Sequence, residues 1–189
     1  MNDVDRSAII VELAAQPRAH GSWAGETHVQ KAACLMQELP GVPVDFRFVL
    51  YKHGPFAFGL RDLLNRMETW GYLQLEVQPY PYGPKIVDGR LSASLKAESD
   101  APRSYTPRIE FVAGQLAGCN VSDLERIATA LFIECEAAVI PAKRAERLTE
   151  LKPHISPVEA PKAFERLAEI RLSAQGAGFG RFLEAGQAG

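Results

Sequence analysis

The sequence has few cysteines and no paired cysteine motif. Its three cysteines, Cys34, Cys119 and Cys135, are odd in number and lack the CxxC spacing of a zinc or dithiol site. Two of them fall among apolar residues of expected helices, where a free thiol behaves as a small hydrophobic side chain. We therefore expect structural roles for the cysteines in a reduced protein.

An excess of charge of one sign is also lacking. The chain has 21 Lys and Arg residues against 23 Asp and Glu residues, a formal net charge of −2, and neither half is basic. Nothing in this balance attracts the whole molecule to nucleic-acid phosphates or to an anionic membrane. Any binding of nucleic acid would have to depend on a local patch.

Long hydrophobic runs are absent as well. No apolar stretch reaches the length of a membrane span, and the N-terminus lacks the basic segment and apolar core of a signal peptide. The 189 residues are 47% hydrophobic and 23% charged, which is typical of a globular protein able to bury a core. We expect a cytoplasmic protein without membrane association.

Motifs for catalysis and metal binding are missing too. His53 is the candidate general base, but the sequence offers neither a GxSxG serine nor a cysteine in a polar loop as its nucleophile. The four histidines, His20, His28, His53 and His154, include no pair at helical metal-ligand spacing. We expect no metal, no cofactor and no enzymatic activity, and an enzyme centred on His53 is the weaker alternative.

Hydrophobic periodicity predicts two helices at the start of the chain. The first covers residues 4–15, with Pro17 as its stop. The second covers "THVQKAACLMQEL", residues 27–39, where Thr27 and Gln30 occupy the positions of a capping box. Its wide apolar face predicts that this second helix is well buried.

The period then changes from helix to strand and back. Alternating apolar residues predict a strand over 44–51, and a 3.6-residue period predicts a helix over 58–70 that Gly71 caps in the left-handed conformation. Alternation in "YLQLEVQ" predicts that Leu73, Leu75 and Val77 are buried. With Ile86 and Val87 across "PYPYGP", this segment suits a hairpin with a Pro-rich tip.

Four segments follow from this pattern. Residues 1–90 form a winged-helix-like module, 91–106 a linker or exposed loop, 107–175 a C-terminal helical part, and 176–189 a flexible Gly- and Ala-rich tail. Ser122 and Glu125 fit a second capping box, at the start of a helix in the third segment. The expected fold class is mainly α with a small antiparallel sheet (α+β): a winged-helix-like module followed by a C-terminal helical bundle.

The stretch "VLYKHGPF", residues 49–56, is the candidate functional corner. Gly54 permits a tight turn, Pro55 fixes its backbone, and His53 caps or braces it. We predict a contact surface that combines this corner with the exposed face of the 58–70 helix and with the hairpin tip: Lys52, His53, Arg61, Arg66, Tyr80 and Tyr82.

DNA binding is the main alternative to protein binding. The 58–70 helix would be the reading helix and Tyr80 and Tyr82 would lie on the wing of a transcriptional regulator. Its exposed face carries Arg61 and Arg66 together with acidic residues, so the charges roughly cancel. We therefore favour protein contacts over DNA reading.

Several of these residues resemble a known family. Gln30-Lys31 on a helix, a strand that ends in Tyr51 to Pro55, and the segments "FGLRDLLNRM" and "WGYL" resemble SocA-like antitoxin domains, also called Panacea domains, and the related YwgA-like uncharacterised proteins. The resemblance covers about residues 25–90 and extends less closely to "LKPHIS" at 151–156. This sequence differs in having "AACLMQ" in place of a longer aromatic run, and in its own C-terminal helices.

The resemblance implies a small bacterial or phage protein that acts by binding other proteins, as an antitoxin or a proteolytic adaptor. Together with the residue patterns, it predicts a non-enzymatic protein–protein interaction module, antitoxin-like or defence-associated. The expected partner is a toxin, a defence effector or a second copy of the chain, so a homodimer is included. A winged-helix DNA-binding regulator is the alternative.

Overall fold

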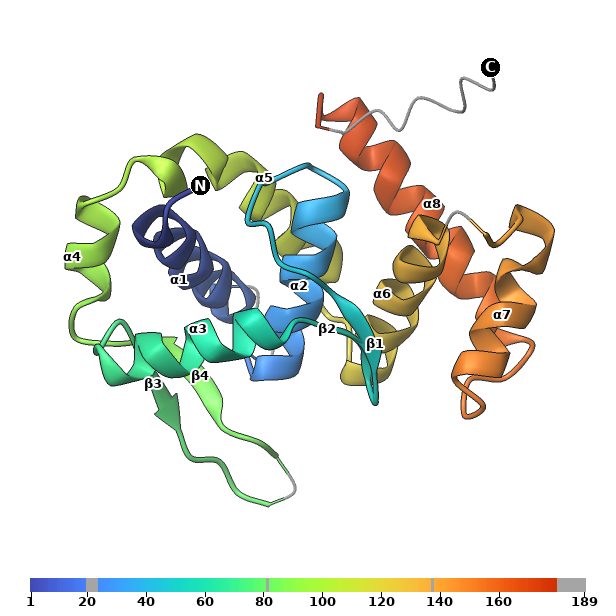
Figure 1. The fold of residues 1–189 in the computed structure, drawn as a ribbon, viewed down its shortest axis with the longest axis horizontal. Helices are drawn as coiled ribbons and strands as arrows, with labels where there is room; N and C mark the ends of the chain where they lie inside the picture. The colour runs from blue at the N-terminus through green and yellow to red at the C-terminus, as the bar shows by residue number, and fades with distance from the viewer. Residues whose placement is uncertain (20–23, 81, 137, 180–189) are drawn as a thin grey trace.

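The computed structural model describes residues 1–19, 24–80, 82–136 and 138–179. It is mainly helical with two small antiparallel sheets of two strands each, which confirms the predicted fold class (Figure 1). The elements are α1 (Asp3–Ala19), α2 (Glu26–Glu38), β1 (Val49–Tyr51), β2 (Gly54–Phe56), α3 (Phe58–Thr69), β3 (Leu73–Glu76), β4 (Lys85–Asp88), α4 (Ser92–Ala97), α5 (Ala101–Leu116), α6 (Val121–Cys135), the 3-10 turn η1 (Pro141–Lys143), α7 (Arg144–Leu151) and α8 (Glu159–Gly176).

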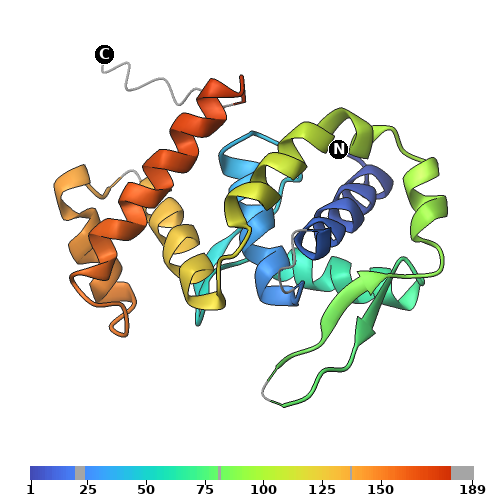
Figure 2. The same cartoon turned by 180° about the vertical axis from the view of Figure 1, so that it is seen from behind.

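Helix α2 lies at the centre of the molecule. It packs against α1 and α5 on one side and against α6 on the other, and α6 in turn packs against α7 and α8 (Figures 1 and 2). The β3–β4 ribbon projects from the body below α3. None of the described helices is both long enough and apolar enough to cross a membrane.

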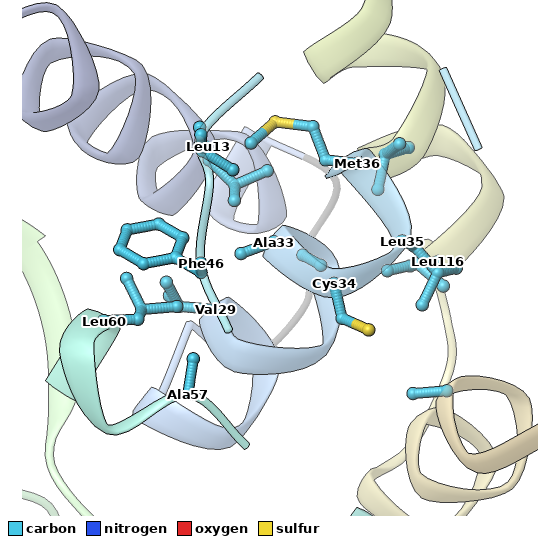
Figure 3. Close-up of a cluster of buried hydrophobic side chains, with 14 of the residues drawn as sticks. Leu13, Val29, Ala33, Cys34, Leu35, Met36, Phe46, Ala57, Leu60 and Leu116 are labelled. Carbon is cyan, nitrogen blue, oxygen red and sulfur yellow. The ribbon is translucent and has the colours of Figure 1, made fainter. Parts of the chain in front are cut away.

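A single hydrophobic core joins the two halves of the chain. Figure 3 shows Phe46 from the 39–48 segment near Leu13 of α1, Val29 of α2 and Leu60 of α3, with Leu116 of α5 beside Leu35 on the other side of α2. The same cluster continues through α6 to Ile170 on α8. Cys34 is part of it, and burial raises the pKa of its thiol, as expected for a structural cysteine.

The end of α3 agrees with the sequence prediction. Its apolar stripe is buried, and Gly71 follows with φ +78. The amide of Tyr72 donates to Met67 O at 2.8 Å and that of Gly71 to Glu68 O at 3.0 Å, which is the Schellman pattern of a glycine-capped helix. This cap turns the chain directly into β3.

The segment predicted as a linker or exposed loop, residues 91–106, is mostly helical. It contains the short helix α4 and the first turn of α5. Leu95 is buried in the core, and Ser99 Oγ donates to Asp5 Oδ1 at 2.6 Å. The prediction was wrong because a six-residue helix with one buried leucine is too short to show a helical period.

The strand predicted over 44–51 is limited to its last three residues. Val44 and Phe46 are buried while Asp45 and Arg47 are exposed, so the alternation is real. However, only residues from Val49 onward pair with another strand, and the Phe46 backbone bonds instead to the Gln37 side chain, with Phe46 N donating to Oε1 at 2.8 Å. Alternating apolar and polar residues show that one face of an extended segment is buried. They do not require the segment to be hydrogen-bonded to a second strand.

The predicted hairpin is present as β3 and β4, with Leu75 opposite Ile86. Leu73 is buried, but Leu75 is partly exposed and Val77 is 89% exposed. The prediction that both are buried was wrong because α3 covers only the base of the ribbon. Tyr80 and Tyr82 lie near the tip, and Pro81 lies outside the described residues.

Two further differences concern helix starts. Gly25, without a side-chain cap, precedes α2, so the predicted capping box of Thr27 and Gln30 is absent. At α6 the box is formed by Asn120 and Asp123, two positions before the predicted pair. Gln30 and the predicted second cap residue, Glu125, are instead buried in the interior.

The part predicted to be helical, residues 107–175, contains most of α5 and of α8, together with α6 and α7. Helix α8 continues to Gly176, the first residue of the predicted flexible tail. Phe179 packs edge-on against Phe111 of α5, with ring centroids 5.6 Å apart. The rest of that predicted tail, residues 180–189, lies outside the described residues.

Candidate functional site

The stretch VLYKHGPF folds as a tight hairpin. Tyr51 lies opposite Gly54, so Lys52 and His53 form its two-residue turn. Pro55 lies in β2 opposite Leu50, which corrects the prediction that it shapes the turn. The corner between a strand and a helix is therefore a hairpin that precedes α3.

Gly54 is required at the end of this turn for two reasons. Its φ of +83 belongs to the left-handed region that favours glycine. A Cβ at this position would also lie only 2.8 Å from Oγ1 of Thr129 on α6. Glycine therefore allows both the backbone conformation and the close packing of the hairpin against α6.

Lys152 holds the turn from below. Its side chain is only 6% exposed, and its ammonium donates to the carbonyl oxygens of Tyr51 at 2.5 Å and Lys52 at 2.6 Å. The residue follows the last residue of α7, a hundred positions further along the chain. A charged donor between two carbonyls fixes the backbone on both sides of the turn.

Two consecutive residues of α2 hold the second strand and its exit into α3. Lys31, only 1% exposed, donates to Pro55 O at 2.8 Å. Gln30 donates to Ala57 O at 3.1 Å and accepts from Ala57 N at 2.9 Å. Burial lowers the pKa of Lys31 to about 8.

Glu125 supplies the negative charge of this buried group. Its carboxylate is 8% exposed; one oxygen lies 3.4 Å from both Lys152 Nζ and His154 Nε2, and the other lies 4.0 Å from His53 Nδ1. The carboxylate thus lies beneath the turn, between a buried ammonium and two partly exposed imidazoles. An opposite charge at this distance offsets part of the cost of burying Lys152.

The outer side of the hairpin presents aromatic and basic side chains. Tyr51 and Phe58 are 52% and 51% exposed, and their ring centroids lie 5.7 Å apart. Buried Phe56 lies beneath them, with ring centroids 5.6 Å and 5.2 Å away. We call the exposed set the hairpin face, consisting of Tyr51, Lys52, His53, Phe58 and Arg61.

Arg61 borders the hairpin face from the first turn of α3. Its guanidinium lies over the Phe56 ring, 4.4 Å from the centroid, and its Nε donates to Glu26 Oε1 at 2.9 Å. The hydrogen bond to this carboxylate raises the pKa of Arg61. Arg61 is thus held in place, and its charge is balanced by Glu26.

The predicted site residues fall into separate groups. Lys52, His53 and Arg61 belong to the hairpin face. Arg66 lies near the other end of α3, where its guanidinium is 5.7 Å from the Trp70 ring centroid. Tyr80 and Tyr82 are exposed near the tip of the ribbon. The six residues therefore do not form one continuous predicted surface.

Periodicity and motif reasoning missed the buried side chains that position the hairpin. These are Gln30, Lys31, Glu125, Thr129 and Lys152. The available signal was the resemblance itself, since the Gln-Lys pair and the LKPHIS segment on which it rests contain three of them. Periodicity considers only the spacing of apolar residues, so it overlooked these short polar motifs.

The described residues contain no arrangement typical of a metal centre. Within residues 1–19, 24–80, 82–136 and 138–179, no three His, Cys, Asp or Glu side chains are grouped as ligands. His20 lies outside these ranges. The hairpin face offers exposed rings and cations, which suit recognition of another molecule.

A hollow of about 440 Å³ lies between α6 and α8. Its arginines already have partners: Arg126 bonds to Asp123 at 2.7 Å and to Glu159 at 2.5 Å, and Arg166 bonds to Glu169 at 3.0 Å. The Arg126–Glu159 pair links the two helices, and the other two pairs lie within α6 and α8. Ion pairs within the protein therefore account for the charged residues of this hollow. The exposed rings of the hairpin face have no comparable structural explanation.

No protein-family model matches this chain, and no curated protein matches its sequence. What the hairpin face can do follows from its geometry and charge.

Proposed function

We propose that this chain is a non-enzymatic protein–protein interaction module, antitoxin-like or defence-associated, from a bacterium or phage. The hairpin face is its binding surface, and the partner is a toxin or a defence effector. The observation that carries the proposal is the clamping of the hairpin backbone by Gln30, Lys31 and Lys152 beneath exposed aromatic residues. The sequence resemblance to SocA-like antitoxin domains supports the same conclusion.

The clamped backbone favours binding because it is already ordered. A flexible loop loses conformational entropy on association, whereas a preorganised one loses little. Two buried lysines are a costly way to hold a surface turn, since most buried charge is destabilising unless it is well paired. A fold that keeps them at this turn specifies its shape closely, as a recognition surface requires.

The side chains of the hairpin face also suit a protein partner. Aromatic residues and arginine dominate the energetic centres of protein interfaces, and Tyr51 and Phe58 are exposed next to Arg61. The charge balance of α3 disfavours DNA as the partner. Arg61 is neutralised by Glu26, and Asp62 and Glu68 are exposed on the same helix without an ion pair among the described residues.

Co-purification with the products of neighbouring genes tests the proposal. We expect one of them to remain bound to the wild-type chain, and the Tyr51→Ser/Phe58→Ser variant to bind at least about tenfold more weakly because two buried contacts are lost. Val158→Ser, which changes an exposed apolar residue outside the hairpin face, is the matched control and should bind normally. Melting temperatures of all three chains show that folding is intact.

DNA binding in place of protein binding would contradict the proposal. The proposal fails if no neighbouring product binds and the chain instead retards DNA at physiological salt. Arg66→Ala and Arg61→Ala would then weaken DNA binding, because each removes a cation from the reading helix. In that case the regulator alternative would hold.

A further inference from the structure

The β3–β4 ribbon has one covered edge and one open edge. The amide of Ile86 on β4 donates to Ala24 O at 2.8 Å, away from β3. Its partner Leu75 is therefore in a non-hydrogen-bonded pair, and the N–H and C=O of Leu75 point outward from the other side of the ribbon. Within the described residues, neither group has a hydrogen-bond partner. An open strand edge of this kind can pair with another chain.

A small apolar hollow is lined in part by Leu75. It has a volume of about 90 Å³ and lies between α3 and the face of the ribbon that carries Leu75. Its apolar lining consists of Leu64, Leu73, Leu75, Pro84 and Ile86. This space accommodates one aliphatic side chain but no drug-sized ligand.

Two carboxylates line the hollow, and a third lies on the opposite face of the ribbon. Glu26 and Glu68 line it, and Glu76 on β3 follows Leu75 on the opposite face of the ribbon. Glu26 is paired with Arg61, and Glu76 lies opposite Lys85 in the β3–β4 ladder, whereas Glu68 has no ion-pair partner among the described residues. Three carboxylates against these two cations leave a net negative charge near the edge, which would attract a basic segment.

We propose that the β3 edge binds an extended segment of a partner protein in which an aliphatic residue is flanked by lysine or arginine. The segment pairs with Leu75 as a third strand, and its aliphatic side chain fills the hollow. A basic residue next to it points to the opposite face of the ribbon, beside Glu76, and a basic residue two positions away lies on the face of Glu68. Backbone pairing supplies affinity, and the hollow with its carboxylates supplies specificity. This surface adjoins the hairpin face at the Arg61–Glu26 pair, but the proposal does not depend on the function proposed for that face.

The charges disfavour a second copy of the chain as the occupant. Pairing of two β3 edges would bring Glu68 and Glu76 of both copies to one seam. Like charges close together across paired strands are destabilising. A basic segment from another protein meets the same carboxylates favourably.

The test uses a random 12-residue peptide library displayed on phage and selected on the whole chain. We expect enriched peptides to share an aliphatic residue between basic ones. Synthetic copies should bind Leu75→Pro at least about tenfold more weakly, because proline removes the outward N–H while the bonds to β4 remain. The Glu68→Lys/Glu76→Lys variant should lose a similar factor through charge.

Matched controls separate this surface from others. Glu110→Lys changes an exposed carboxylate on α5 and should leave peptide affinity unchanged, as should Tyr51→Ser on the hairpin face. Bound peptide should also slow hydrogen exchange of the Leu75 amide, which reports strand addition directly. This measurement on the wild-type chain decides the matter if Leu75→Pro proves unstable.

Three outcomes would overturn the proposal. The first is a selection that enriches no peptide. The second is peptides that bind both edge variants as well as the wild type and leave the exchange of the Leu75 amide unchanged. The third is self-association in sedimentation experiments that Leu75→Pro abolishes, which would assign the edge to a second copy.

Discussion

At the scale of single residues, the two buried lysines beneath the hairpin differ in how their charge is balanced. Lys152 lies 3.4 Å from a carboxylate oxygen of Glu125, whereas the one hydrogen-bond partner of Lys31 among the described residues is the carbonyl of Pro55. Removal of Lys31 from water without a paired anion is the main reason for its lowered pKa of about 8. Its protonation therefore works against folding.

Stability should rise with pH in the range set by Lys31. Below pH 8 the amine is charged in both the folded and unfolded states, so the full cost of burying the charge applies. Between about 8 and the ordinary value of 10.5, the folded state releases its proton first, and the free energy of unfolding increases. The gain amounts to about 3 kcal/mol if the whole shift is expressed.

Urea denaturation of wild type and Lys31→Met at several pH values between 7 and 10.5 measures this gain. Tyrosines and other lysines titrate in both proteins, so the difference in free energy between them isolates Lys31. We expect that difference to shift in favour of the wild type as pH rises. A difference that stays constant, or that shifts toward the variant, would contradict the lowered pKa.

Single residues also mark where sequence reasoning failed. Gln30 and Glu125 were predicted to cap helices, because a polar residue three positions after a Thr or Ser fits a capping box. Both are instead buried, and Gln30 bonds to the backbone of Ala57, 27 positions further along the chain. A capping box is a local pattern, and nothing local distinguishes it from a long-range contact.

At the scale of elements, the β1–β2 hairpin depends on Gly54. In Gly54→Ala, a left-handed φ costs about 1–2 kcal/mol for a residue with a Cβ. The new Cβ would also lie 2.8 Å from Thr129 Oγ1, so α6 or the hairpin has to move. We expect a loss of more than about 2 kcal/mol in the free energy of unfolding, measured by urea denaturation.

Two further variants separate the causes. Gly59→Ala on α3 places a Cβ in open space within a helix, so it should leave stability unchanged or raise it by up to about 1 kcal/mol. Adding Thr129→Ala to Gly54→Ala should restore part of the lost free energy of unfolding. The second change removes the close contact with Thr129 Oγ1 but not the cost of the left-handed backbone. Equal stability of Gly54→Ala and Gly59→Ala would refute this account of the hairpin.

Elements with a strong local signal were predicted well. The apolar stripe of α3 and the glycine after it were both evident in the sequence, because helix period and cap lie within one short stretch. The 44–51 strand was less accurate, since pairing requires a second strand that sequence alternation does not reveal. The hairpin partner, Gly54–Phe56, has only three residues and shows no alternation of its own.

At the scale of the whole molecule, the helical second half completes the core of the first. Helix α1 packs along α5, and α2 packs against both α5 and α6. The buried group beneath the hairpin likewise takes Glu125 from α6 and Lys152 from the segment after α7. The hairpin face thus depends on segments from both halves of the chain.

A fragment of residues 1–90 should therefore fail to fold by itself. It would expose the faces of α1 and α2 that α5 and α6 cover, and the hairpin would lack Lys152. We expect no cooperative thermal transition by circular dichroism, in contrast to the full chain. A cooperative transition near that of the full chain would show that the predicted winged-helix-like segment is an independent domain.

The fold class, most helices, the glycine cap of α3 and the β3–β4 hairpin follow from local sequence patterns, because each depends on residues that are close along the chain. Long-range packing establishes that VLYKHGPF is a clamped hairpin and that residues 91–106 are mainly helical. It also decided which polar residues are buried. Gln30, Glu125 and Lys152 acquire their roles from partners 27 to 101 positions away, and such contacts form only when the helices pack.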